Sequence, residues 1–236
     1  MRRSGIHRTV ERGLALALAL LLVAAVPARA TSSPALVRDI NVSGNGSTPN
    51  GLTALGGYVY FSAYDRIHGR EVWRRNGTTS TLVSDINVGA NSSNPQGFTA
   101  LGSYLYFQAT DGTHGAELWR TDGTTTDLVS NINSGADGSY ANGFTKLGDY
   151  LYFSAYDSTH GTELWRTDGT TTTLVSDINA GSDGSALYGF TVLGGYLYFA
   201  AYDNTNGTEL WRTNGTTTTL VDRKSTRLNS SHQIIS

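Results

Sequence analysis

A tryptophan recurs every 46 residues along this chain, with no insertion or deletion in the interval. The four positions are Trp73, Trp119, Trp165 and Trp211. A strict period of this length indicates one supersecondary unit copied several times, whose neighbours bury each other's apolar faces. We therefore expect a repeat domain at 31–221, with units at about 51–96, 97–142, 143–188 and 189–221 and a partial unit at 36–50.

Within a unit the apolar residues alternate with period two, which is typical of strands and not of helices. In "SYLYFQA", Tyr104 and Tyr106 point to one face and Leu105 and Phe107 to the other. The second unit predicts four strands separated by glycine-containing turns, at 98–101, 104–109, 117–121 and 125–132.

Both faces of these strands are apolar, so each sheet needs cover on both sides. Four-stranded sheets arranged around an axis meet this need. We predict an all-β protein, a β-propeller of four-stranded blades, with four blades as a lower limit in a truncated chain. A linear β-solenoid of stacked hairpins is the alternative. The early segment "ALVRDI" has the sequence of a last strand, as a ring requires when its two termini complete one blade.

The two ends of the chain differ from the repeats. Residues 1–30 combine an arginine-rich start, the apolar run "LALALALLLVAAV" and the pattern "ARA", which predict a signal peptide and a secreted or cell-surface protein. No second apolar segment follows, so we expect no membrane span in the mature chain. The tail 222–236 begins "DRKSTRLNSSH", which resembles the in-frame translation of a sequencing adapter, and we expect it to be non-native.

Between the two ends, residues 31–221 carry 17 acidic and 9 basic side chains, a net charge of −8 that the whole-chain value of −2 conceals. Such an acidic surface argues against nucleic acid and anionic membranes as partners. The chain contains no cysteine, so its stability must come from packing and not from disulfides. We expect no cofactor, with Ca²⁺ as the one cation that the acidic surface could bind.

The stretch "HGTELWRTDGT" resembles the bacterial ELWxxDGT repeat family. Two copies match its motif in full, at 117–124 and 163–170. The departures in the outer copies are Val72, Asn76 and Asn214. The resemblance covers 36–221 and implies an exported bacterial protein with propeller-like repeats. The threonine run after "DGT" is shorter than is usual for the family, which shortens one turn.

Three repeated features of the motif have structural interpretations. The tryptophans are expected in the core, with the indole N–H given to a neighbouring carbonyl, and stacking on a carbohydrate is the alternative. The Asp-Gly and Asn-Gly pairs predict hairpin turns. The glutamates could pair with the arginines three residues later, or accept amides of the preceding turn. These glutamates are Glu71, Glu117, Glu163 and Glu209.

A second series of carboxylates stands four residues before a glycine, at Asp65, Asp111, Asp157 and Asp203. The pattern is loosely similar to the Asp-box turn of sialidase propellers, in which the aspartate accepts backbone N–H bonds and ties down a hairpin. The same turn contains His68, His114 and His160, whereas the fourth copy has Asn206. A ring of metal ligands would not readily accept that change, but a turn residue that offers a side-chain hydrogen bond would.

The copies differ most in nine-residue loops: "VSGNGSTPN", "VGANSSNPQ", "SGADGSYAN" and "AGSDGSALY". In an up-and-down blade these loops share one end with the aspartate turns, so we expect a ligand there, either a glycan or an extracellular protein. The candidate ligand-binding residues are Asp65, His68, Asp111, His114, Asp157, His160, Asp203, Tyr140 and Tyr188. Asp137 and Asp183 are the candidates for Ca²⁺.

The sequence contains no HExxH motif, no Ser–His–Asp set and no phosphate-binding glycine loop. We therefore expect a non-catalytic binding or scaffold module. One alternative is a propeller enzyme that acts on extracellular polysaccharide, with acid and base carboxylates from the Asp65 and Glu71 series. The other is a purely structural surface repeat.

Overall fold

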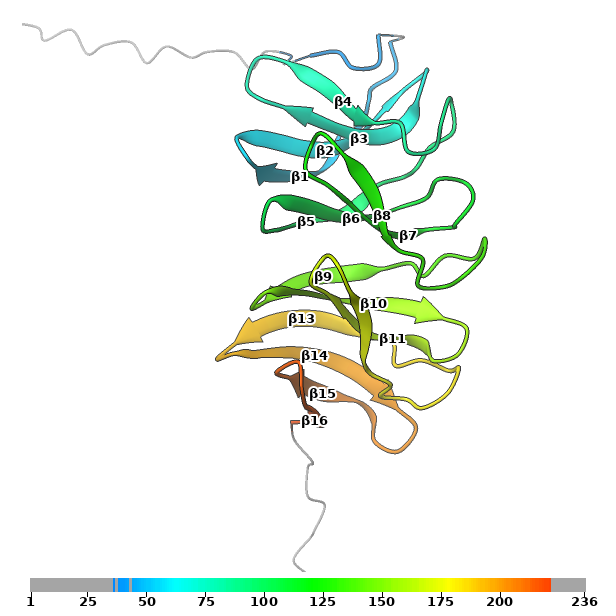
Figure 1. Ribbon diagram of the computed structural model, residues 1–236, viewed down its shortest axis with the longest axis vertical. Coiled ribbons are helices and arrows are strands. Elements are labelled where there is room, and N and C mark those ends of the chain that lie inside the picture. Colours follow the sequence, from blue (N-terminus) through cyan, green and yellow to red (C-terminus); the bar gives the residue numbers. More distant parts are fainter. Residues whose placement is uncertain (1–35, 37, 43, 222–236) are drawn as a thin grey trace, which may run out of the picture. The chain divides into compact units, whose positions relative to one another are not determined.

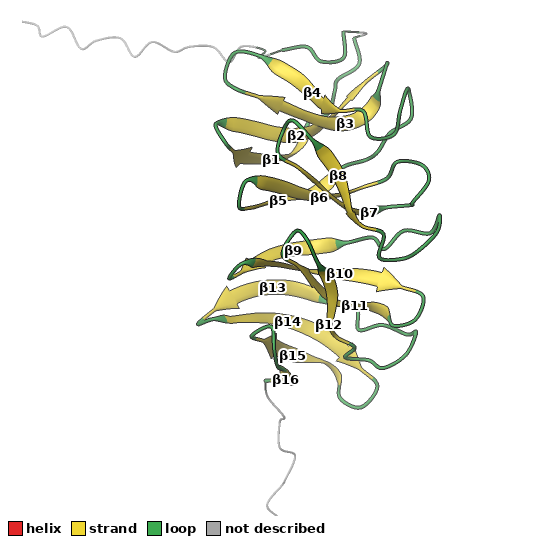
Figure 2. Ribbon diagram, in the orientation of Figure 1, coloured by secondary structure: helices red, strands yellow, loops and turns green. Residues whose placement is uncertain are grey.

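The computed structural model describes residues 36, 38–42 and 44–221, so the expected signal peptide and the tail 222–236 lie outside it. The described residues form sixteen strands, which all belong to one compact unit (Figure 1). Turns and loops connect the strands, and no helix occurs among the described residues (Figure 2).

The strands form four sheets of four, which we call blades 1 to 4. Blade 1 comprises β1 (Asn50–Leu55), β2 (Tyr58–Asp65), β3 (Gly69–Arg75) and β4 (Ser80–Ser84). Blade 2 comprises β5 (Gln96–Leu101), β6 (Tyr104–Ala109), β7 (Glu117–Thr121) and β8 (Thr126–Ser130). Blade 3 comprises β9 (Asn142–Leu147), β10 (Tyr150–Asp157), β11 (Gly161–Thr167) and β12 (Thr172–Ser176). Blade 4 comprises β13 (Tyr188–Leu193), β14 (Tyr196–Asp203), β15 (Gly207–Thr213) and β16 (Thr218–Leu220).

Every blade is an antiparallel meander, because its strand order follows the sequence. The register repeats from blade to blade: Phe107 lies opposite Trp119 in blade 2, and Phe153 lies opposite Trp165 in blade 3. The prediction of four strands in the second unit is confirmed, and β6 and β7 begin and end at the expected residues.

Neighbouring blades bury each other's faces. The cluster between blades 1 and 2 joins Tyr60 and Val72 to Leu105 and Phe107, and corresponding clusters lie between the later blades. Tyr106 belongs instead to the cluster with blade 3, so the predicted alternation of the two faces is confirmed. Each fully buried side chain of this size contributes about 1.5–3 kcal/mol, which makes these interfaces the main source of stability.

The first strands of successive blades lie side by side, in the order β1, β5, β9 and β13. This contact places the first strand of each blade on the inside, as in a propeller whose blades surround an axis. The start of each inner strand therefore follows directly on a variable loop.

The tryptophans belong to the blade interfaces. Trp73 and Trp119 are 7% and 8% exposed, and Trp165 and Trp211 are half-buried. The core interpretation is confirmed, but the predicted hydrogen bond is wrong. All four indole nitrogens are buried without an acceptor among the described residues, because the side chains packed around the indoles are apolar.

An arginine links each of two blades to the next at the end with the Asp-Gly turns. The Arg120 guanidinium lies 4.3 Å from the centre of the Tyr104 ring, and its Nη1 donates to the Gly169 carbonyl of blade 3 at 2.7 Å. Arg166 repeats the arrangement with Tyr150 and Gly215. The suggested pairing of these arginines with the ELW glutamates is therefore wrong, because the tyrosine ring and the carbonyl hold each guanidinium.

The expected last strand at the start of the repeat domain is not formed by residues 36 and 38–42. Ile40 instead packs on Phe61, Ala63 and Trp73 of blade 1. This position corresponds to that of Ile86, which packs in the same way on blade 2. The described part of the segment thus acts as the loop that precedes blade 1.

Candidate functional site

Two connections of each blade lie together at one end of the sheet: the aspartate turn and the loop to the next blade. In blade 1 the Ser93 amide of the loop donates to the Arg70 carbonyl at 3.1 Å, next to the turn. The Ser93 carbonyl then accepts the Thr110 amide of blade 2 at 3.0 Å. The prediction that both connections share one end is confirmed, and each variable loop bridges two blades.

The glutamate of the ELW motif fastens this loop. Glu117 is fully buried, and its carboxylate accepts the Ser139 hydroxyl at 2.6 Å and the Ser139 amide at 2.9 Å. It also accepts the amides of Ile132 and Asn133 at 3.0 and 3.3 Å. The corresponding pairs are Glu71 with Ser93 and Glu163 with Ser185. One buried carboxylate therefore satisfies several backbone groups of a loop that crosses between blades.

Burial raises the pKa of these three carboxyls, although the hydrogen bonds from the loop oppose the shift. Glu71, Glu117 and Glu163 are 0% exposed, and donors of the protein surround their oxygen atoms. The glutamates are thus loop anchors that do not face solvent. The proposed acid or base role of the Glu71 series has no support in this geometry.

Sequence reasoning did not find the serine partner. Ser93, Ser139 and Ser185 each follow their glutamate by 22 residues. They occupy the same place in loops that otherwise vary, and this persistence was the available signal. The prediction that the glutamate accepts backbone amides is confirmed. The amides that it accepts belong to the variable loop, however, and not to the aspartate turn.

The aspartates tie down their turns as predicted. Asp157 Oδ1 accepts the amides of Thr159 and His160 at 2.8 and 2.7 Å, and Oδ2 contacts His160 Nδ1 at 2.8 Å. Burial raises the pKa of Asp157, but the hydrogen bonds from His160 and Thr159 outweigh it and lower the pKa. The same balance lowers the pKa of Asp65 and Asp111.

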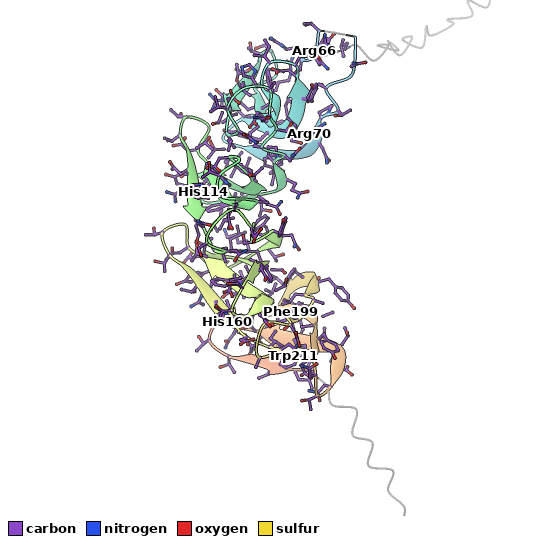
Figure 3. The ribbon with its side chains drawn as sticks, turned by 90° about the vertical axis from the view of Figure 1, so that its right-hand side faces the viewer. Arg66, Arg70, His114, His160, Phe199 and Trp211 are labelled. Atoms are coloured by element: carbon purple, nitrogen blue, oxygen red, sulfur yellow. The ribbon has the colours of Figure 1, made fainter. Side chains whose placement is uncertain are left out.

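The histidines complete these turns. Their side chains are 30%, 38% and 34% exposed at His68, His114 and His160, and Figure 3 shows the last two in separate blades. Because the aspartate is ionised, Nδ1 is the donor to it. In blade 4 the Asn206 side-chain amide donates to Asp203 Oδ2 at 2.7 Å. Asparagine thus replaces histidine without loss of the bond, which supports the interpretation as a turn residue.

We predict that His160→Asn preserves the turn and removes a pH-dependent contribution to stability. The bond to Asp157 raises the pKa of His160. Stability from this shift is fully present below the unfolded pKa of 6.5 and is lost as the pH rises through the folded pKa. The melting temperatures of the two proteins should therefore differ more at about pH 5 than at about pH 8. An equal difference at both pH values would contradict this assignment.

A hollow of 560 Å³ lies at the start of the inner strands, at the loop end of the blades. Its lining includes Phe98, Asn142, Phe144, Tyr188 and Phe190. Glycine at the start of the inner strand in blades 1 to 3 makes room for the phenylalanine of the next blade. A Cβ at Gly143, where φ is +72°, would lie 2.5 Å from the Phe190 ring. The hollow is thus lined by aromatic edges, backbone and a few polar side chains.

Two tyrosines of the variable loops are exposed at this end. Tyr188 is 59% exposed and lines the hollow, and Tyr140 is 61% exposed. Tyr140 has a φ of +51°, a left-handed conformation that is uncommon for a residue with a bulky side chain. Its counterparts at the same loop position share this conformation: Thr48, Asn94 and Ala186. Backbone strain at one repeated position shows that the loops keep one shape although their sequences differ.

The other candidate residues are not brought together. Each blade holds its own aspartate turn, and Asp137 and Asp183 are exposed on two different loops. Within the described ranges there is no group of three His, Asp or Glu side chains that could hold a metal ion. The structure thus provides no shared ligand set for the Ca²⁺ site considered from the sequence.

Comparison with known proteins supports the fold. No family model matches the chain, and no curated protein matches it. Similar solved structures include a puromycin hydrolase (12% identity, TM-score 0.50), a putative TolB from Agrobacterium tumefaciens (13%, 0.46) and the β-propeller domain of the Trilobed protease from Pyrococcus furiosus (9%, 0.45). The fold is a β-propeller.

These likenesses concern the fold alone. The matches cover 70%, 73% and 74% of this chain. They cover 27%, 64% and 55% of the three structures, so the chain spans less than two thirds of each. The described residues contain no helix that is long and apolar enough to span a membrane.

Proposed function

We propose that this propeller is an exported, non-catalytic module of the ELWxxDGT repeat type that binds a neutral glycan at its loop end. The observation that carries the proposal is the hollow at the start of the inner strands, with the exposed Tyr188 ring on its lining. Ligand sites of this kind combine aromatic walls with a few polar groups. An aromatic ring with a polar hydroxyl suits a ligand that is apolar on one face and hydroxylated at its edges.

The charge of the repeat domain narrows the ligand class. Its net charge of −8 repels anionic ligands, so an uncharged sugar is favoured over an acidic one. The positions that vary most between the copies are on the loops that lead into the inner strands, and Asn142, Leu187 and Tyr188 are the variable positions that line the hollow. The strands and the ELW glutamates vary much less. This division is typical of binding proteins in which a rigid scaffold presents variable loops.

The carboxylates support binding without catalysis. Three of the four ELW glutamates, Glu71, Glu117 and Glu163, are buried under the loops, and the aspartates of the turns accept bonds from their own backbone. Glycoside hydrolysis needs two carboxyl groups that flank one bond, and neither series offers such a pair on one blade. Export rests on the signal-like residues 1–30, and the family assignment rests on the two complete ELW motifs.

We predict that Tyr188→Ala weakens glycan binding about 5- to 150-fold, because loss of an aromatic platform removes about 1–3 kcal/mol. The exported chain would be screened against neutral oligosaccharides, and hits measured by calorimetry with and without Ca²⁺. Tyr64→Ala is the matched control, since Tyr64 is 37% exposed and does not line the hollow. Turnover of a polysaccharide would favour the enzyme alternative, and the absence of saturable binding would favour a structural repeat.

A further inference from the structure

The outer face of blade 4 repeats the surface that blades 1 to 3 each bury against the next blade. Leu118 and Leu164 are 0% exposed in their interfaces, whereas Leu210 at the same place is 47% exposed. Tyr106 and Tyr152 are 2% exposed, but Tyr198 is half-buried. This face is apolar and is left without a partner among the described residues.

The polar anchors of blade 4 are also incomplete. Glu209 is exposed and accepts no hydrogen bond from a described residue, although Glu71, Glu117 and Glu163 are each closed by a loop serine. Arg212 lies 4.6 Å from the centre of the Tyr196 ring, as in the other blades, but no Gly carbonyl is bound to it in the described part of the chain.

The outer face of blade 1 carries the complementary half of each contact. Val59 is 39% exposed, whereas Leu105, Leu151 and Leu197 at the same place are 0% exposed. A cavity of 390 Å³ lies over this face, and its lining includes Ile40, Val59 and Phe61.

Its polar groups match those of blade 4. The Ser47 carbonyl oxygen accepts the Tyr64 amide, as the Ser93 carbonyl accepts the Thr110 amide. Among the described residues, however, no glutamate closes the Ser47 loop. Gly77 has open space where Gly169 touches Tyr106 and Arg120 of the preceding blade. Blade 1 thus lacks one carboxylate and one arginine, and blade 4 offers both.

We propose that these two faces form one interface, and that the occupant of each is a second copy of this chain docked head to tail. Blade 4 of one copy would receive blade 1 of the other, with Glu209 on the Ser47 loop and Arg212 on the Gly77 carbonyl. The two faces continue the pattern of the three blade interfaces inside the chain, residue for residue. Such a heterologous contact closes a ring when the rotation between blades permits and otherwise extends the assembly. This proposal of self-association does not depend on the proposed glycan binding.

The test measures the mass of the exported full chain by light scattering after gel filtration. We expect at least twice the monomer mass at micromolar concentrations. Val59→Glu and Leu210→Glu should each weaken self-association at least tenfold, because each buries a charge in an apolar face. Ile67→Glu is the control, since Ile67 is 71% exposed in a turn.

The decisive arm mixes the two variants. Each keeps one intact face, so the equimolar mixture should form a one-to-one pair that grows no further. A wild-type chain that stays monomeric up to about 100 μM would overturn the proposal, and would leave further repeats of a longer chain as the occupant of these faces. Variants that still self-associate, or a mixture that does not pair, would also overturn it.

Discussion

Glu117→Ala should lower the free energy of unfolding by about 3–5 kcal/mol. The substitution leaves three amides and the Ser139 hydroxyl without the acceptor that they share in the native state. Each buried donor left unsatisfied costs about 1–3 kcal/mol. Relaxation of the loop lets water reach some of these donors, so the total loss is smaller than the sum of the individual costs. Urea unfolding followed by tryptophan fluorescence measures the change.

The repeat provides its own control for this experiment. Glu209 stands at the same place in the motif but is exposed, without a hydrogen-bond partner among the described residues. Glu209→Ala should change the stability of the dilute chain by less than about 0.5 kcal/mol. Equal losses for both variants would mean that the glutamate acts through the strand in which it lies and not through the loop.

The fold could be predicted almost entirely from the sequence because its two main signals are local and repeated. The alternation in "SYLYFQA" defines the strand, and the period of 46 residues defines the unit that must stack. Two apolar faces per strand then require a neighbour on each side. Leu105 and Tyr106 are adjacent, so the alternation places their side chains on opposite faces of the sheet. In the structure Leu105 packs against the preceding blade and Tyr106 against the next.

The partners of the anchors were not predicted because they are distant in the sequence: Ser139 follows Glu117 by 22 residues, and Gly169, the partner of Arg120, lies in the next unit. Glu117 and Arg120 are three residues apart and of opposite charge, so a local pair was one of the two alternatives that the sequence left open. The structure separates them, since Glu117 reaches the loop at one end of the blade and Arg120 reaches blade 3 at the other. The spacing of residues within one strand does not indicate partners this far along the chain.

The candidate site was predicted at the level of a surface but not of its residues. In an up-and-down blade the aspartate turn and the variable loop must lie at the same end of the sheet, and the structure confirms this prediction. The hollow depends on the inner strands of all four blades meeting, which needs the tertiary arrangement. The aspartates and histidines proposed as ligand residues turn out to be engaged in their own turns, and Tyr188 is the proposed residue that lines the hollow.

Gly169→Ala should destabilise the chain far more than the same substitution at Gly77. Both glycines occupy the same turn with φ values of +93° and +96°, so a Cβ costs about 1–2 kcal/mol of backbone strain at either position. At Gly169 the new atom would also overlap the Tyr106 hydroxyl and lie 3.2 Å from Arg120 Nη1. At Gly77 nothing lies within 4 Å.

The difference between the two variants therefore isolates the contact between blades. We expect Gly169→Ala to lose about 1–3 kcal/mol more than Gly77→Ala, because the overlap must displace a packed tyrosine and break the bond from Arg120. Urea unfolding of the two variants at low chain concentration measures this difference. Equal losses would show that the turn is sensitive to backbone strain alone. A larger loss at Gly169 would establish that the Asp-Gly turn of the motif holds neighbouring blades together, as well as reversing the chain.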